Sequence, residues 1–286
     1  MAGPRATVRQ RRLARELRRL REGAHLTIEQ VANKLELSPS TVSRIETAQV
    51  GIRPRDVREL LDIYGVAGVQ RDELLQIARE RRQQPWWQEY RDLPNMALAG
   101  FEADATSISQ FSALLVPGLL QTEAYAREVL TAIRLDARPG DIQRRMDLRL
   151  NRQALLTGET APQYWVVLDE AVVCRPVGGP AVMGAQLEYL AQMAALPSVT
   201  LQVLPFSAGA HAGMDGEFTI FGYRAPEDPD VVYIENTGGD AYIEDADVTR
   251  RYNRIFDHLR AAALDPAESV RTLAELEHRL QEPERG

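Results

Sequence analysis

Apolar positions recur at helical spacing between residues 13 and 82, and turn-forming residues interrupt them at four places. The interruptions fall at Gly23, 37–39, 51–54 and 65–68. Glycine and proline end helices because glycine adopts left-handed backbone conformations and proline lacks an amide hydrogen. The pattern therefore predicts five short helices joined by brief connections, which is typical of a compact helical domain.

From Pro85-Trp86-Trp87 onward the pattern alternates between strand-like and helical stretches. Runs rich in β-branched and aromatic residues predict four strands, at 164–168, 199–204, 218–221 and 231–234. Helical spacing predicts helices at 123–135, 141–156, 181–196, 247–263 and 266–280. Asp265 is the expected N-cap of the last helix, with Pro266 at its first position. We therefore expect an all-α five-helix domain over residues 1–84 and an α+β domain over residues 85–286.

Length and composition agree with two domains of a soluble globular protein. The 286 residues are 44% apolar and 26% charged, and no apolar run approaches the roughly 20 residues that cross a bilayer. The N-terminus lacks the basic, apolar and small-residue pattern of a signal peptide. A single cysteine, Cys174, fits a reducing compartment. We expect a cytoplasmic protein.

Charge separates the two predicted domains. Residues 1–84 carry 17 lysine and arginine residues against 11 aspartate and glutamate residues, a net charge of +6, whereas the rest carries −13. Eight arginines fall within the first 21 residues, where phosphate attraction would act through counterion release. A solvated helix face is the alternative interpretation. The distribution favours a nucleic-acid partner for the N-terminal domain.

Residues 27–46 have the pattern of a helix-turn-helix. Thr27 precedes an apolar-periodic run, and Gln30 follows it by three residues, which is a capping box. After a turn, Ser38 can cap a second helix with Pro39 at its first position. Helical spacing places Val42 on the inner face of this second helix.

The outer face of the second helix suits the major groove of DNA. Ile45 follows Val42 on the inner face, whereas the outward positions are small and polar apart from one arginine: Ser40, Ser43, Arg44 and Thr47. Small side chains let a helix approach base edges closely, and Arg44 could donate two parallel hydrogen bonds to a guanine. The sequence therefore predicts sequence-specific binding to double-stranded DNA.

Residues 13–77 resemble the xenobiotic-response-element family of helix-turn-helix regulators. The resemblance is carried by Leu17-Arg18-Arg19-Leu20-Arg21, Leu26-Thr27, Val31-Ala32, residues 38–46 and Arg53-Pro54. It implies base contacts from Ser40, Ser43 and Arg44. It implies contacts to the DNA backbone from Thr27, Ile28, Ser38, Thr41 and Arg53.

The resemblance has two further implications, one for Ile28 and one for Arg21 with Glu46. The family commonly has glutamine where this chain has Ile28, so here only the amide of Ile28 could contact phosphate. Arg21 and Glu46 match a structural pair between the first and third helices. A five-helix bundle that binds protein, as some members of this fold do, is the alternative.

Residues 86–280 resemble the C-terminal domain of WhiJ-like and Scr-antitoxin-like actinobacterial regulators. The motifs that carry the resemblance are Trp86-Trp87-Gln88-Glu89-Tyr90, Val116-Pro117-Gly118-Leu119-Leu120-Gln121-Thr122, Leu204-Pro205-Phe206, His211-Ala212-Gly213, Tyr233-Ile234-Glu235, Tyr252, Phe256 and Leu259. The resemblance implies a small BldB-like protein partner, encoded nearby, that modulates DNA binding.

Enzymatic patterns are weak, so we expect no catalytic activity, no metal and no cofactor. The four histidines lack metal-ligand spacing, Cys174 lacks a nucleophile motif, and no glycine-rich phosphate loop occurs. Residues 207–216 form an expected flexible loop that carries His211 and Asp215 between two strands. This is the candidate ligand or partner loop, with a plain surface connection as the alternative.

The leading hypothesis is a homodimeric transcriptional repressor without a membrane segment. One short helix covers few base pairs, so symmetric pairing on two half-sites is expected, with the C-terminal domain dimerising and receiving a protein signal. An antitoxin-like module that neutralises a small partner and binds DNA for autoregulation is one alternative. A small-molecule-sensing regulator or an enzyme that uses the His211 loop is another.

Overall fold

A computed structural model of the chain describes residues 8–80, 86–90, 93, 96–135, 137–223, 229–236 and 239–281. It divides into two compact units, Met1–Asp104 and Ala105–Gly286. A helical N-terminal region precedes a region with a mixed sheet and helices, as the sequence predicts. The domain boundary expected between residues 84 and 85 falls within 81–85. These residues lie outside the described residues, so the boundary stays a prediction.

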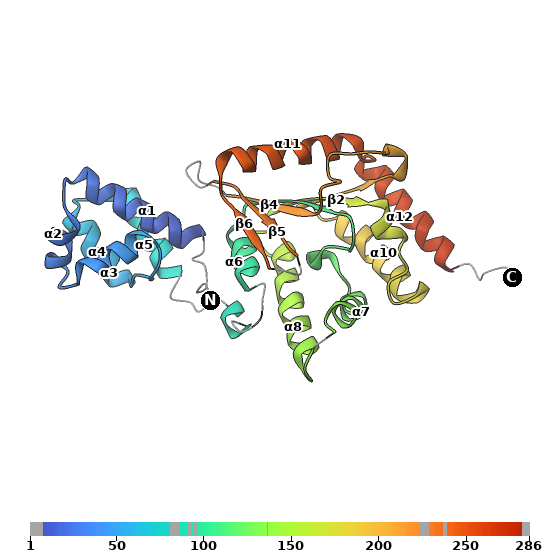
Figure 1. Cartoon of the computed structure of the whole chain (residues 1–286), viewed down its shortest axis with the longest axis horizontal. Helices are drawn as coiled ribbons and strands as arrows, with labels where there is room; N and C mark the ends of the chain where they lie inside the picture. Colours follow the sequence, from blue (N-terminus) through green and yellow to red (C-terminus); the bar gives the residue numbers. More distant parts are fainter. Residues whose placement is uncertain are drawn as a thin grey trace. The chain divides into compact units, whose positions relative to one another are not determined.

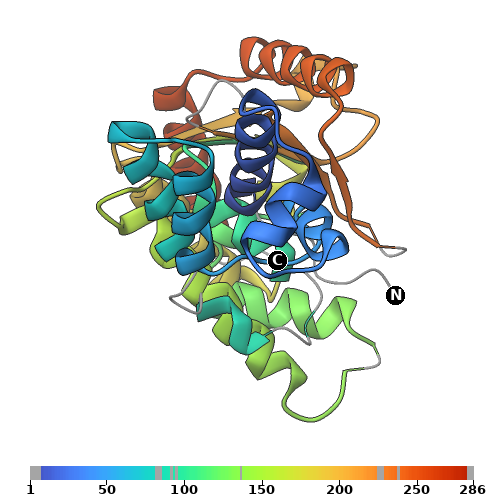
Figure 2. The same ribbon diagram turned by 90° about the vertical axis from the view of Figure 1, so that its left-hand side faces the viewer.

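The five predicted helices of the N-terminal unit are confirmed (Figure 1; Figure 2). They are α1 (Val8–Gly23), α2 (Ile28–Lys34), α3 (Pro39–Glu46), α4 (Pro54–Ile63) and α5 (Gly68–Glu80). A 3-10 helix, η1 (Trp86–Tyr90), and α6 (Met96–Asp104) follow in the same unit. The first five helices bury one apolar core, with Leu17, Val31, Val57 and Leu61 at its centre.

Helices α1 to α4 end in the same way. The amide after each left-handed residue donates to a carbonyl five residues earlier, as in Leu37 N to Ala32 O at 2.9 Å, which is a Schellman motif. Only α4 has glycine at the left-handed position, Gly65. The other three ends place His25, Glu36 and Ala48 at φ of 55°, 54° and 55°. These side chains occupy a conformation that costs an L-residue roughly 1–2 kcal/mol.

The second unit contains a six-stranded mixed sheet in the order β3-β2-β1-β4-β5-β6. The strands are β1 (Ser107–Ser112), β2 (Gln163–Asp169), β3 (Val199–Leu204), β4 (Phe218–Gly222), β5 (Val231–Ile234) and β6 (Ala241–Ile243). Strands β1, β2 and β3 are parallel to one another, and each later strand is antiparallel to its neighbour. The four predicted strands are present, whereas β1 and β6 were not expected.

Helices lie on both faces of this sheet (Figure 1). They are α7 (Glu123–Ile133), α8 (Asp141–Gln153), α9 (Glu170–Cys174), α10 (Pro180–Ala194), α11 (Ala246–Ala262) and α12 (Pro266–Gln281). Phe256 and Leu259 of α11 pack with Phe111, Phe218 and Val232 of the sheet to form an apolar core. No helix in the described ranges is long and apolar enough to cross a membrane.

The beginning of α12 protects the β3 edge of the sheet. Leu264 N donates to Val203 O at 2.9 Å, and Val203 N donates to Ser269 Oγ at 2.9 Å. Asp265 caps the helix by accepting from Glu268 N at 2.7 Å, which confirms the predicted cap. An edge strand whose backbone is bonded in this way is a poor template for pairing with another chain.

Glutamine side chains hold the segment between β1 and α7 in place, including the 3-10 helix η2 (Gly118–Leu120). Gln186 of α10 is fully buried, accepts from Thr122 N and donates to Leu120 O, both at 2.7 Å. Gln153 of α8 donates to the carbonyls of Gly118 and Gln121. These bonds satisfy backbone groups that would otherwise be buried without partners.

Candidate nucleic-acid interface

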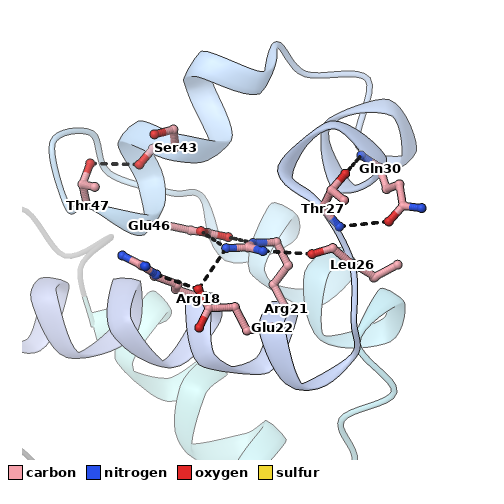
Figure 3. A network of polar contacts seen from close by, with 9 residues as sticks. All are labelled: Arg18, Arg21, Glu22, Leu26, Thr27, Gln30, Ser43, Glu46 and Thr47. Carbon is pink, nitrogen blue, oxygen red and sulfur yellow. Dashed lines mark hydrogen bonds and ion pairs between the residues drawn. The ribbon is translucent and has the colours of Figure 1, made fainter.

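The N-terminus of α2 has the predicted capping box. Thr27 N donates to Gln30 Oε1 at 2.9 Å, and Gln30 N donates to Thr27 Oγ1 at 3.2 Å (Figure 3). Ile28 is the first helical residue, so its amide has no acceptor within the helix. Its side chain packs on the N-terminal core, which gives the isoleucine a structural role at a position where a polar side chain is usual in the resembled family.

The N-terminus of α3 carries three hydroxyl groups that bond to one another. Ser38 Oγ accepts from Thr41 N at 3.2 Å and caps the helix. The same oxygen shares hydrogen bonds with Ser40 Oγ at 2.9 Å and Thr41 Oγ1 at 2.8 Å. If these hydroxyls bond to DNA, the new hydrogen bonds would replace the ones that the hydroxyls make to one another.

The outer face of α3 is the predicted polar surface. Val42 and Ile45 are buried beneath the helix, whereas Ser40 and Arg44 are exposed and Ser43 is half-buried. Thr47 is also exposed, and its Oγ1 donates to Ser43 O at 2.9 Å (Figure 3). The structure thus places the three predicted base-contacting residues on one helix, with Arg44 as its long cationic side chain.

A buried ion pair fixes α3 against α1, and it confirms the predicted pairing of Arg21 with Glu46. Arg21 Nε donates to Glu46 Oε1 at 2.7 Å and Arg21 Nη2 donates to Glu46 Oε2 at 3.0 Å, with side chains 10% and 5% exposed. The bond to Glu46 raises the pKa of Arg21 further above its usual value. Arg21 Nη1 also donates to Leu26 O at 2.9 Å, immediately before Thr27 (Figure 3). One side chain therefore positions both α3 and the start of α2.

Thr41 and Arg53 line the same pocket, which has a volume of about 310 Å³. It lies between the α2–α3 turn, α3 and the start of α4, with an apolar floor that includes Leu35 and Ile52. Arg53 is the exposed N-cap residue of α4, and no side-chain hydrogen bond caps this helix. These two predicted backbone-contacting residues therefore lie on the same side of the unit.

The two predicted loop residues of the second unit have different surroundings. His211 Nε2 lies 3.7 Å from Asp169 Oδ2, its Nδ1 accepts from Gly213 N at 3.2 Å, and its ring packs edge-on against Phe111. Asp215 lies exposed further along the loop. The sequence interpretation missed Asp169, which ends β2 and caps α9 by accepting from Ala171 N. An aspartate between a strand and a helix was the available signal.

Groups of metal-binding side chains do not cluster in the parts of the chain that the structure describes. No group of three or more histidine, cysteine, aspartate and glutamate side chains there could hold a metal ion. Burial raises the pKa of the Cys174 thiol, which disfavours the reactive thiolate.

Two family models match the chain. The model described as a domain of unknown function (DUF5753) matches residues 96–275, and the model described as a helix-turn-helix domain matches residues 12–74. No curated protein and no solved structure matches the chain. The helix-turn-helix match covers the capped helices and the outward face of α3, and it indicates a DNA-binding regulator.

Proposed function

The chain belongs to the DUF5753 family, and from that premise we propose that it is a sequence-specific transcriptional repressor of the xenobiotic-response-element and WhiJ-like kind. The observation that carries the proposal is the arrangement of α3. Its inner face is buried, a buried ion pair holds it, and its outer face presents Ser40, Ser43 and Arg44. A rigid helix with a small polar surface and one arginine suits the major groove.

In this proposal α3 enters the major groove and contacts base edges. Arg44 donates two hydrogen bonds to a guanine, and Ser40 and Ser43 let the helix approach the bases closely. The backbone contacts come from the starts of α2, α3 and α4: Thr27, the Ile28 amide, Ser38, Thr41 and Arg53. Amides at helix N-termini favour phosphate because they lack acceptors and lie at the positive end of the helix dipole.

Replacing Arg44 tests base recognition directly. Arg44→Ala is expected to weaken binding to the preferred DNA sequence roughly 5- to 150-fold, the loss of one bidentate pair. The preferred sequence is first selected in vitro from random DNA, and affinity is then measured by fluorescence anisotropy at fixed salt.

Arg58→Ala is the matched control, because Arg58 is exposed on α4 and its loss changes the charge equally. This control should weaken specific and random DNA equally and only slightly. An Arg44→Ala variant that loses the same factor on random DNA as on the selected site would refute base contact by Arg44.

The second unit, in this proposal, dimerises the repressor and binds a small BldB-like protein, without catalytic activity. One α3 helix covers few base pairs. Two copies that bind symmetric half-sites therefore bind the DNA site more tightly than one copy does. Light scattering on the selected DNA should give the mass of two chains per site. A single chain per site would refute the dimer while leaving DNA recognition by α3 intact.

A further inference from the structure

The parallel strands of the second unit bring three connecting segments together at the edge of the sheet that is formed by the carboxyl ends of these strands. Because β1, β2 and β3 run in the same direction, residues 113–117, 169–174 and 205–217 all leave from their carboxyl ends. This edge is where open sheets of parallel strands commonly bind their ligands. The segments here differ from a small-molecule site because they expose large apolar side chains.

Leu114, Phe206 and Met214 are 63%, 60% and 69% exposed. Leu114 follows β1 by two residues and Phe206 follows β3 by two residues. Met214 lies in the loop that His211 and Gly213 hold against Phe111 of β1. Seven large hydrophobic side chains are exposed in the described parts of the chain, and three of them are gathered at this edge. We call Leu114, Phe206, Met214 and the exposed Asp215 the strand-end patch.

Long-range hydrogen bonds fix the backbone under the strand-end patch. Phe206 N donates to Glu170 Oε2 at 2.7 Å, and the amides of Ala113 and Leu114 both donate to Glu217 Oε1 at 2.6 Å. A Cβ atom added to Gly213 would lie 2.5 Å from the Phe111 ring, so the loop packs closely on β1. A surface already ordered in this way loses little conformational entropy when it binds.

The chain segments that form the strand-end patch carry only acidic charges. Residues 105–118, 161–174 and 196–223 contain no lysine or arginine, whereas they contain Asp169, Glu170, Asp215 and Glu217. Arg175 follows α9 in the chain, and Arg279 of α12 lies near Cys174 at the end of α9. Acidic groups beside exposed apolar side chains complement a segment that carries lysine or arginine among large apolar residues.

We propose that the strand-end patch is the docking surface for a basic, apolar segment of a partner protein. The inference rests on the regulator function proposed above, because it assigns the surface through which the second unit receives its protein signal. The apolar side chains supply contact area, and the acidic groups select a partner of opposite charge over a second acidic unit or over DNA.

Selection from phage-displayed short random peptides on the immobilised full chain tests this proposal. Enriched peptides should combine lysine or arginine with leucine, phenylalanine or tryptophan, and the most enriched peptide is then synthesised for affinity measurement by fluorescence anisotropy. The variant Leu114→Ser/Phe206→Ser/Met214→Ser should bind it roughly tenfold or more weakly. The charge reversal Asp215→Lys should also weaken binding.

Matched controls lie in the same unit and away from the patch. Leu135→Ser removes a leucine that is 89% exposed, and Glu159→Lys reverses an exposed charge. Both controls should bind the peptide as the unmodified chain does. Thermal melting should show that all variants remain folded, since each replaced side chain is exposed.

Three outcomes would overturn the proposal. They are enrichment of acidic or uncharged peptides, equal affinity of the triple serine variant, and a triple variant that changes only the oligomeric mass, which would make the patch a contact between copies. Binding of the unmodified chain to its selected DNA is measured in parallel. Absence of selective DNA binding would refute the regulator function, whereas peptide binding that the variants do not alter would refute the patch.

Discussion

The two units organise their polar side chains over different distances along the chain. In the N-terminal unit the caps join residues three apart, as Thr27 joins Gln30 and Ser38 joins Thr41. In the second unit side chains bond to backbone far away in sequence, 64 residues from Gln186 to Thr122 and 104 residues from Glu217 to Ala113. Local bonds shape individual helices, whereas distant bonds hold connecting segments against the sheet.

The N-terminal unit also contains a buried pair of residues distant in sequence, Arg21–Glu46, and breaking it is expected to have the largest effect on stability. Arg21→Ala leaves Glu46 buried without a counter-ion and removes the bond to Leu26 O, so the free energy of unfolding should fall by about 3–5 kcal/mol. Urea denaturation of the N-terminal unit, followed by circular dichroism at helical wavelengths, measures the loss.

The exposed pair Arg18–Glu22 is the control for this comparison, with side chains 59% and 52% exposed. Arg18→Ala should lower the free energy of unfolding only slightly, because solvent screens an exposed pair. A similar loss from Arg21→Ala and Arg18→Ala would show that burial does not distinguish the two pairs. The double change Arg21→Met/Glu46→Leu should recover most of the loss, because no buried charge is left unpaired.

Breaking the distant hydrogen bonds of the second unit is expected to lower the free energy of unfolding by an intermediate amount. Gln186→Ala leaves Thr122 N and Leu120 O without their partner and opens space in a fully buried position. The free energy of unfolding of the second unit should fall by about 2–3 kcal/mol. Gln192→Ala on the same helix removes an exposed glutamine that bonds only to the Glu188 side chain, and it should change stability by less than about 0.5 kcal/mol. An equal loss of stability in Gln186→Ala and Gln192→Ala would contradict the inference that the distant hydrogen bonds stabilise the second unit more than the local one does.

The smallest expected change in the free energy of unfolding comes from a helix end of the N-terminal unit. Unlike the changes above, it is a stabilisation. Glu36 lies in the turn between α2 and α3 at φ of 54°, where glycine avoids the steric cost of a side chain. Glu36→Gly should therefore raise the free energy of unfolding by about 0.5–1 kcal/mol. Glu59→Gly, within the right-handed helix α4, should lower it by about 1 kcal/mol. Destabilisation by both changes would contradict the strain inferred at Glu36.

The helical fold of the N-terminal unit was predictable from periodicity and caps. Thr27, Ser38 and the breaks near Gly23, 51–54 and Gly65 mark helix ends through interactions within a few residues. In the second unit four strands were predictable from their apolar runs, but β1 was not, although it is paired on both sides. Four of the six residues in its sequence, Ser-Ile-Ser-Gln-Phe-Ser, are polar, and its two apolar residues, Ile108 and Phe111, are both buried.

The candidate site divides in the same way. Helical spacing alone indicated that Ser40, Ser43 and Arg44 lie opposite Val42 and Ile45, and the structure agrees. Spacing could not indicate that Ser40 and Thr41 bond to Ser38, because hydroxyl rotation depends on local packing. In the second unit the sequence indicated a loop that carries His211 and Asp215, but it could not indicate that Asp169, 42 residues before His211, lies beside the histidine.

By itself, the sequence determined the five short helices, their caps, the polar outer face of α3 and the charge difference between the two halves, because these depend on residues within one or two helical turns. Only the tertiary structure decided the central place of β1, the burial of Gln186, the bonds from Glu217 to the backbone after β1, and the placement of Leu114, Phe206 and Met214 at the carboxyl ends of the parallel strands. Each of these depends on strand order. Parallel pairing brings together residues that the intervening helices separate by dozens of positions, and no short-range pattern records that pairing.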